Sequence, residues 1–137
     1  MMTAQPDPPE SGRPRVLIIE DNADLLGILE QLLAVDYDIS TARRGEDGVS
    51  MALTIRPDVI ILDLQLPQMD GIETGRWIKS ELGNDVAILV LTAVAGKGDP
   101  EAILESGCCD AYLAKPASLD AIRSRVAELL ASGSRAE

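Results

Sequence analysis

The 137-residue chain carries 23 acidic and 12 basic residues, and its formal net charge of −11 argues against direct binding to DNA or RNA, which depends on neutralising phosphates with Lys and Arg. It has no His, which excludes histidine catalysis and histidine metal ligation, and no Phe, so we expect an aliphatic core. No apolar stretch approaches the roughly 20 residues of a membrane span, and residues 1–15 lack the layout of a secretory signal, so we expect a cytoplasmic protein without a membrane partner.

The two ends of the chain differ in composition from its centre. Residues 1–14 hold four of the eight prolines, a composition that predicts a disordered leader or a linker. Residues 15–131 alternate short apolar runs with helical patterns, which indicates a βαβ series and a parallel sheet in one α/β domain. Residues 132–137 are expected to form a short polar tail, with no room for a second domain.

The first half of the domain predicts two strands and two helices. An apolar run opens it, and Leu25, Ile28, Leu29 and Leu32 then follow the spacing of an amphipathic helix. The second strand alternates polar and apolar residues, as an edge strand does, and Pro57 bars continuation of the second helix. In chain order, these elements are expected over residues 16–19, 23–34, 37–42 and 45–55.

The second half predicts three more strands and three more helices. Pro100 is suited to a first helical turn, and Ser118 is a plausible N-cap for the last helix. The adjacent Cys108 and Cys109 cannot form an unstrained disulfide and are interpreted as small apolar residues of a turn. In chain order, the six elements are expected over residues 59–62, 72–82, 87–91, 100–107, 111–114 and 119–131.

Polar side chains stand where four of these strands end. Glu20 and Asp21 close the first apolar run, Asp63 the third, Thr92 the fourth and Lys115 the fifth. The carboxyl ends of parallel strands form one edge of the sheet, where ligands bind. Three carboxylates, a hydroxyl and an ammonium group at one edge suit a divalent metal ion and a phosphoryl group.

Chemistry suggests a role for each of these groups. A carboxylate can attack phosphorus, and Asp63 is the best candidate acceptor. The charges of Glu20 and Asp21 would raise the pKa of Asp63, and a bound Mg²⁺ would offset them. We expect Asp21 and Asp63 to be direct ligands of this ion, with Glu20 acting directly or through water. Lys115 can pair with Asp63 and then hold a phosphoryl oxygen, and the Thr92 hydroxyl can hydrogen-bond another.

Other acidic and amide side chains have simpler interpretations. A lone Asp at a strand or helix end is usually a solvated terminus or a cap, and this is how we interpret Asp24, Asp58 and Asp70. Asn22 is left open between a part in the site and the start of the first helix.

Four motifs in order resemble the receiver domain of two-component response regulators, over roughly residues 15–131. They are Val16–Asn22, Asp63–Gly71, Leu91–Ala93 and Tyr112–Pro116. The resemblance implies a flavodoxin-like, doubly wound five-stranded parallel sheet of order 2-1-3-4-5, as in the chemotaxis members of the family. It further implies that the backbone carbonyl of Gln65 is a metal ligand and that Tyr112 is a switch aromatic that responds to movement of Thr92.

The resemblance also implies a function. A histidine kinase or a histidine phosphotransfer protein would supply a phosphoryl group to Asp63 with Mg²⁺ present, and the phosphorylated domain would bind a downstream effector protein. Such a domain catalyses only its own phosphoryl transfer and autodephosphorylation and is not an enzyme in the usual sense. Residues 95–100 and 107–110 resemble receivers of hybrid sensor kinases and of single-domain cell-cycle regulators, so a stand-alone regulator and a hybrid-kinase receiver both stay open.

Three rival functions fit the residues less well. Haloacid-dehalogenase-type phosphatases need an Asp-x-Asp pair on the first strand, whereas Asp63 lies on the third. A degenerate receiver that serves only for docking would not need a complete set of acceptor-site residues. A flavin or nucleotide binder would need a Gly-rich phosphate loop after the first strand, and the sequence has none there.

Overall fold

The computed structural model of the chain describes residues 12–66, 69–92 and 100–132. Most of the predicted leader, five of the six residues of the predicted tail and the loop at 93–99 lie outside these ranges. Among the described residues, none of the helices has the length and apolar character that a membrane crossing requires.

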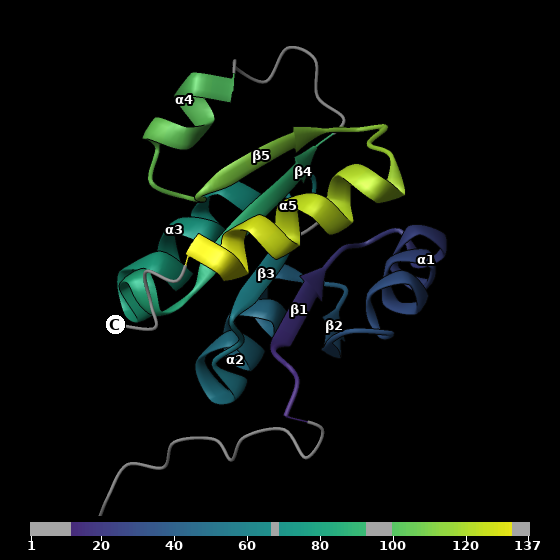
Figure 1. Cartoon of the computed structure of the whole chain (residues 1–137). Coiled ribbons are helices and arrows are strands. Elements are labelled where there is room, and N and C mark those ends of the chain that lie inside the picture. The colour runs from purple at the N-terminus through teal and green to yellow at the C-terminus, as the bar shows by residue number, and fades with distance from the viewer. Residues whose placement is uncertain (1–11, 67–68, 93–99, 133–137) are drawn as a thin grey trace, which may run out of the picture.

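Five parallel strands form one sheet (Figure 1). They pair in the order β2-β1-β3-β4-β5, which confirms the expected topology. Each strand lies within one residue, at either end, of its predicted range. Their bounds are β1 (Arg15–Ile19), β2 (Asp38–Ala42), β3 (Val59–Asp63), β4 (Ala87–Thr92) and β5 (Ala111–Ala114).

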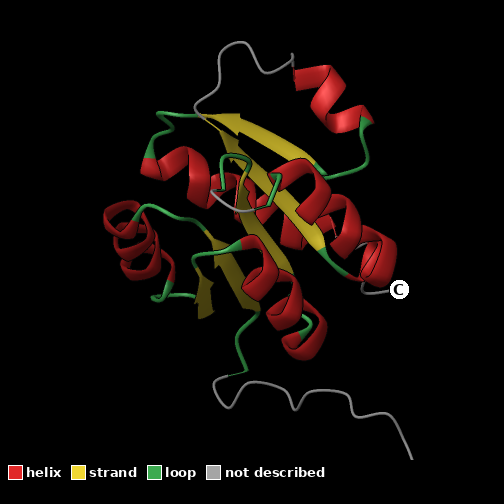
Figure 2. Cartoon of the chain, turned by 180° about the vertical axis from the view of Figure 1, so that it is seen from behind, coloured by secondary structure: helices red, strands yellow, loops and turns green. Residues whose placement is uncertain are grey.

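Helices cover both faces of the sheet. Figure 1 views the face covered by α1 and α5, and Figure 2 shows α2 and α3 on the opposite face. Ile103 of α4 also joins the core on that opposite face. The predicted fourth helix ends two residues early, before the turn in which Gly107 has a φ of 84°. The helices are α1 (Ala23–Leu33), α2 (Gly45–Ile55), α3 (Gly71–Leu82), the short 3₁₀ turn η1 (Gly83–Asp85), α4 (Pro100–Glu105) and α5 (Leu119–Ser132).

The alternation of side chains along each strand divides the core into two halves. On β1, Leu17 and Ile19 join the core under α2, α3 and α4, while Val16 and Ile18 join the core under α1 and α5. Because successive side chains of a strand point to opposite faces, a strand that is buried on both faces must be apolar throughout. This explains why the central strands β1, β3 and β4 contain unbroken apolar runs, whereas the edge strand β2 alternates polar and apolar residues.

Polar side chains begin the helices as the sequence suggests. Oδ1 of Asn22 accepts a hydrogen bond from the Leu25 amide at 3.0 Å, and Oδ1 of Asp70 accepts one from the Ile72 amide at 2.8 Å. Ser118 Oγ accepts one from the Ala121 amide at 3.0 Å, and all three are therefore N-caps. The interpretation of Asp58 was wrong: its Oδ2 accepts from the Arg15 amide at 2.9 Å and so holds the start of β1.

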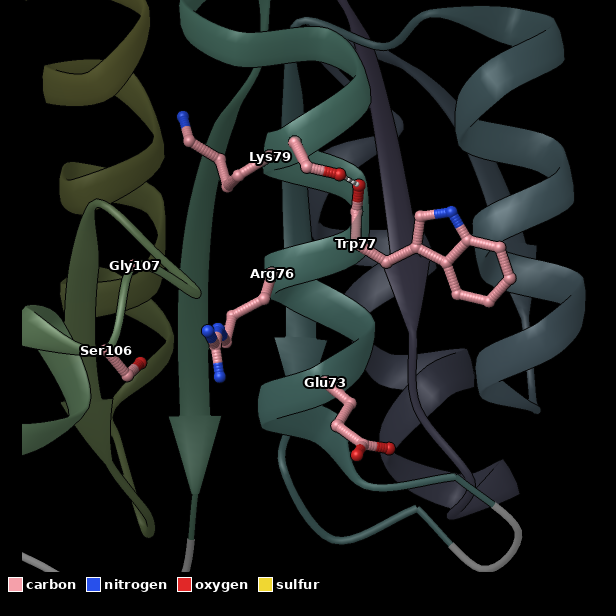
Figure 3. A pocket seen from close by; sticks show the side chains of 7 residues that line it. Glu73, Arg76, Trp77, Lys79, Ser106 and Gly107 are labelled. Atoms are coloured by element: carbon pink, nitrogen blue, oxygen red, sulfur yellow. Dashed lines mark hydrogen bonds between the residues drawn. The ribbon is translucent and has the colours of Figure 1, made fainter.

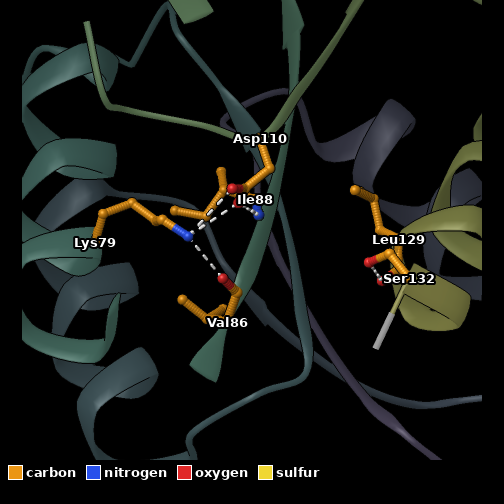
Figure 4. A network of polar contacts seen from close by, with 6 residues as sticks. All are labelled: Lys79, Val86, Ile88, Asp110, Leu129 and Ser132. Atoms are coloured by element: carbon orange, nitrogen blue, oxygen red, sulfur yellow. Dashed lines mark hydrogen bonds and ion pairs between the residues drawn. The ribbon is translucent and has the colours of Figure 1, made fainter. Parts of the chain in front are cut away.

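A network of polar contacts fastens α3 to the end of the sheet that lies away from the strand carboxyl ends (Figure 4). Lys79 Nζ donates to the Val86 carbonyl at 2.8 Å and to Asp110 Oδ2 at 3.0 Å. The same carboxylate oxygen accepts from the Ile88 amide at 2.8 Å. Asp110 precedes β5, so this network joins α3, β4 and the start of β5.

Cys108 and Cys109 are free and buried, as small apolar residues of a turn would be. Both side chains belong to the core under α2, α3 and α4.

Candidate functional site

Four of the predicted site residues lie together at the carboxyl edge of the sheet. Glu20 follows β1, Asp63 ends β3, Thr92 ends β4 and Lys115 follows β5. The side chains of Glu20, Asp63 and Thr92 are nearly inaccessible, with residues exposed by 2%, 4% and 0%. Charged and polar residues this deeply buried need partners, and their partners define the site.

Lys115 joins the two buried carboxylates. Its Nζ lies 3.2 Å from Oε1 of Glu20 and 3.6 Å from Oδ2 of Asp63. The Lys115 amide also donates to the Thr92 carbonyl at 2.8 Å, which ties the residue after β5 to the end of β4. The predicted pairing of Lys115 with Asp63 is present, but the shorter contact is with Glu20.

Backbone amides bind the remaining oxygens of both carboxylates. Glu20 Oε2 accepts from the Asn22 amide at 3.1 Å, and Asp63 Oδ1 accepts from the Gln65 amide at 3.0 Å. Burial is the main influence on Glu20 and raises its pKa, and the nearby charge of Asp63 raises it further. The Asn22 amide and the Lys115 ammonium oppose this by stabilising the charged form.

The side chain of Thr92, at the end of β4, is fully buried. Its Oγ1 is buried and makes no hydrogen bond to any of the residues that the structure describes. An unpaired buried hydroxyl costs stability, of the order of 1–3 kcal/mol. Because it lies at the carboxyl edge of the sheet, this hydroxyl is suited to donating a hydrogen bond to an oxygen of a ligand.

The other residues of the predicted metal set lie further out. The Asp21 and Gln65 residues are exposed, and no three acidic or Cys residues within the described ranges are arranged as a metal site. The predicted coordination therefore stays a prediction. The donor set nevertheless fits Mg²⁺, because it consists of carboxylate and carbonyl oxygens beside a solvent-exposed edge.

Tyr112, the predicted switch residue, is half-buried on β5. It pairs in register with Val90 and packs against the core under α2, α3 and α4.

One contact at this edge was not anticipated. Arg43, directly after β2, donates from its guanidinium to the backbone carbonyl of Asp21 at 3.2 Å. The sequence signals this contact only by a basic residue after a strand, and that pattern is too common to identify Arg43.

A separate hollow of about 540 Å³ lies between α3 and the turn after α4 (Figure 3). Arg76 extends from α3 toward Ser106, Lys79 leaves the same side of the helix, and Trp77 extends from the other side. Ser106 Oγ already donates to the Ile103 carbonyl at 2.6 Å, and Lys79 belongs to the network with Asp110. The polar groups of this hollow are thus largely committed to holding the fold.

Comparison with known proteins decides the family. The model of the response regulator receiver domain matches residues 16–127, most of the chain. The chain is a member of this family. A receiver domain belongs to two-component signalling and is a signalling protein rather than a classical enzyme, which confirms the predicted function class and removes the phosphatase alternative.

Curated relatives of this receiver differ in length. It is 38% identical over 118 residues to the transcriptional regulatory protein PrrA of Mycobacterium leprae, covering 85% of this chain and 50% of PrrA. The receiver thus spans about half the length of that relative. It is 37% identical over 107 residues to the polar-differentiation response regulator DivK of Brucella anthropi, covering 76% of this chain and 85% of DivK.

Solved receiver domains share the fold. The receiver domain of the Francisella response regulator 1452 matches with a TM-score of 0.77 at 27% identity, over 85% of this chain and 96% of that one. A CheY-like receiver domain protein from Methanospirillum hungatei matches with a TM-score of 0.83 at 21% identity, over 91% and 99% of the two chains, and supports the fold alone. Receiver domains typically use Mg²⁺ and take their phosphoryl group from a kinase partner.

Proposed function

We propose that Asp63 is the phosphoryl acceptor of this receiver. The observation that carries the proposal is its position: a buried carboxylate at the end of β3 with one oxygen 3.6 Å from Lys115 and the other bonded to the Gln65 amide. In the transfer, the bond between phosphorus and a histidine nitrogen of the donor breaks, and a bond between phosphorus and a carboxylate oxygen of Asp63 forms. The histidine must come from a kinase or phosphotransfer protein, because this chain has none.

Glu20, Asp21, Asp63 and the Gln65 carbonyl would hold Mg²⁺. The bound ion would supply positive charge to the crowded carboxylates and to the phosphoryl oxygens. Among the described residues, the Lys115 ammonium is the one cationic group in contact with the buried carboxylates of Glu20 and Asp63, which share it. A divalent ligand would correct this imbalance.

Lys115 and Thr92 would then read the phosphoryl group. The Lys115 ammonium can pass from the carboxylates to a phosphoryl oxygen, and Oγ1 of Thr92 can donate the hydrogen bond that it lacks at present. Movement of Thr92 would be passed to Tyr112, which lies on the neighbouring strand β5. A local change in charge would thereby alter a surface that an effector protein recognises.

We place the functional unit at residues 15–131 and the protein in the cytoplasm, where the ATP that phosphorylates a histidine kinase is found. The net charge of −11 supports a protein rather than a nucleic acid as the direct partner of this domain.

The test is labelling by a small-molecule phosphodonor in Mg²⁺, followed by intact mass. Wild-type protein should gain one phosphoryl group, and Asp63→Asn should gain none. Asp24→Asn, which removes an exposed carboxylate in the first turn of α1, is the matched control and should be labelled like wild type. Full labelling of Asp63→Asn would overturn the assignment.

A further inference from the structure

The peptide group between Asp21 and Asn22 is hydrogen-bonded at both ends. Its N–H donates to Oε2 of Glu20 at 3.1 Å, and its carbonyl accepts from the guanidinium of Arg43 at 3.2 Å. This peptide belongs to the loop that carries two of the proposed metal ligands. Its orientation therefore bears on where Glu20 and Asp21 point.

These contacts extend into a continuous line. The other oxygen of Glu20, Oε1, accepts a hydrogen bond from the Lys115 ammonium at 3.2 Å. One chain of hydrogen bonds therefore runs from Arg43 through the Asp21–Asn22 peptide and Glu20 to Lys115. Hydrogen bonds in such a chain polarise one another. A guanidinium on the carbonyl makes the N–H of the same peptide a better donor, which strengthens its hold on the Glu20 carboxylate.

The position of Arg43 is itself determined by the sheet. The Glu20 amide donates to the Ala42 carbonyl at 3.0 Å, which joins the end of β1 to the last residue of β2. Arg43 follows Ala42 directly. The residue that reaches Asp21 is therefore anchored beside it by the sheet and does not depend on a flexible loop.

The neighbouring Arg44 shows that charge alone does not create this contact. Arg44 precedes α2, and its guanidinium lies 3.9 Å from the exposed carboxylate of Glu46. The two arginines carry the same charge and are adjacent in the sequence, but it is Arg43 that donates to the Asp21 carbonyl.

We propose that Arg43 is a positioning residue that orients Glu20 and the Asp21 peptide for Mg²⁺ binding. The inference rests on the proposed function, since it concerns the metal set named there. Two effects of Arg43 on the metal have opposite signs. Its positive charge repels Mg²⁺, whereas its hydrogen bond holds the ligands in place, and we infer that the second effect is the larger.

The opposite signs make the experiment decisive. Calorimetric Mg²⁺ titrations of Arg43→Ala and Arg44→Ala would be compared with wild type. Arg43→Ala should weaken Mg²⁺ binding by about threefold to tenfold, the size expected from the loss of one exposed hydrogen bond of ordinary strength. Arg44→Ala should leave the Mg²⁺ affinity unchanged or slightly higher, because it removes the same charge but keeps the hydrogen bond from Arg43 to the Asp21 carbonyl. Arg43→Lys, which keeps a donor and the charge, should recover part of the affinity.

A second measurement reports on the loop without metal. Amide hydrogen exchange at Asn22 should be faster in Arg43→Ala than in wild type or Arg44→Ala. Without the Arg43 guanidinium the peptide is less polarised, so the hydrogen bond from the Asn22 N–H to Glu20 is weaker. Urea unfolding, followed by the fluorescence of Trp77, the single tryptophan, shows that each variant is folded before titration.

The outcomes separate the two proposals. Equal or tighter Mg²⁺ binding by folded Arg43→Ala, with normal binding and labelling of wild type, overturns the role of Arg43 alone. Failure of the wild-type protein to bind Mg²⁺ or to be labelled at Asp63 overturns the proposed function beneath it.

Discussion

The ammonium of Lys115 lies closer to Glu20, at 3.2 Å, than to Asp63, at 3.6 Å. Without metal, the proposed acceptor therefore shares its counter-ion with a second buried carboxylate. Both carboxylates are almost fully buried, so the ammonium that they share lowers the free-energy cost of placing them side by side.

Lys115→Met should destabilise the metal-free protein by about 1–3 kcal/mol at neutral pH. Removing one partner of a buried pair costs more than this, but Lys115 is partly exposed, and Glu20 can take up a proton. Urea denaturation with and without Mg²⁺ measures the effect. Mg²⁺ should stabilise this variant more than wild type, and adding Glu20→Gln should restore part of the loss. Equal metal-free stabilities of wild type and Lys115→Met would contradict the shared counter-ion.

Glu20→Gln should make the metal-free protein more stable at neutral pH and less sensitive to pH. Burial holds the folded-state pKa of Glu20 above its ordinary value of 4.5, so the folded state binds a proton more readily than the unfolded state. The free energy of unfolding of wild type therefore falls as the pH rises from 4.5 through the folded-state pKa of Glu20, and it stays at the lower value above that pKa.

The gain from Glu20→Gln should thus be greatest at neutral pH and shrink as the pH falls toward 4.5. Thermal unfolding midpoints across this range provide the measurement. A gain that grows on acidification would show that burial does not raise this pKa. Excess Mg²⁺ should reverse the order of the two proteins, because Gln is a poorer ligand than carboxylate.

Thr92→Val should stabilise the unphosphorylated protein by about 1 kcal/mol, because it replaces an unpaired buried hydroxyl by a methyl group of similar size. The matched control is Thr74→Val. Thr74 is equally buried, but its Oγ1 donates to the Asp70 carbonyl at 3.0 Å. Because Thr74→Val removes this hydrogen bond, it should destabilise the protein by a similar amount. Chemical denaturation distinguishes the two signs. Losses of equal size in both variants would mean that Thr92 has a partner in solution.

Gly75→Ala should destabilise the protein by about 2 kcal/mol or more, whereas Gly27→Ala should stabilise it by about 0.5–1 kcal/mol. A Cβ at Gly75 would collide with the Cys108 carbonyl oxygen and lie 3.0 Å from the Cys108 Cβ, so α3 could not pack on the turn before β5. A Cβ at Gly27, also within a helix, meets nothing within 4 Å. Both are compared by urea denaturation, and a stable Gly75→Ala would show that this turn can move away from α3.

Much of the fold could be predicted because its signals are local. Each buried parallel strand must be apolar on both faces, so its ends are marked by the first polar residue, as at Glu20 and Asp63. Caps are local as well, which is why Ser118 could be assigned from the sequence. Asp58 was misjudged because its partner, the Arg15 amide, is 43 residues away.

The site likewise has features that follow from the local sequence and features that only the tertiary structure determines. The residues at the strand ends, and the chemistry that they offer together, follow from the order of residue types along the chain and from the geometry of parallel sheets. Three features of the site depend on side chains that the fold brings together across β1, β2, β4 and β5. They are the contact of Lys115 with Oε1 of Glu20, the hydrogen bond from Arg43 to the Asp21 carbonyl, and the lack of a partner for Thr92 among the described residues. Such contacts join residues as much as 95 positions apart, and their distances are set by packing, which leaves no pattern in the local sequence.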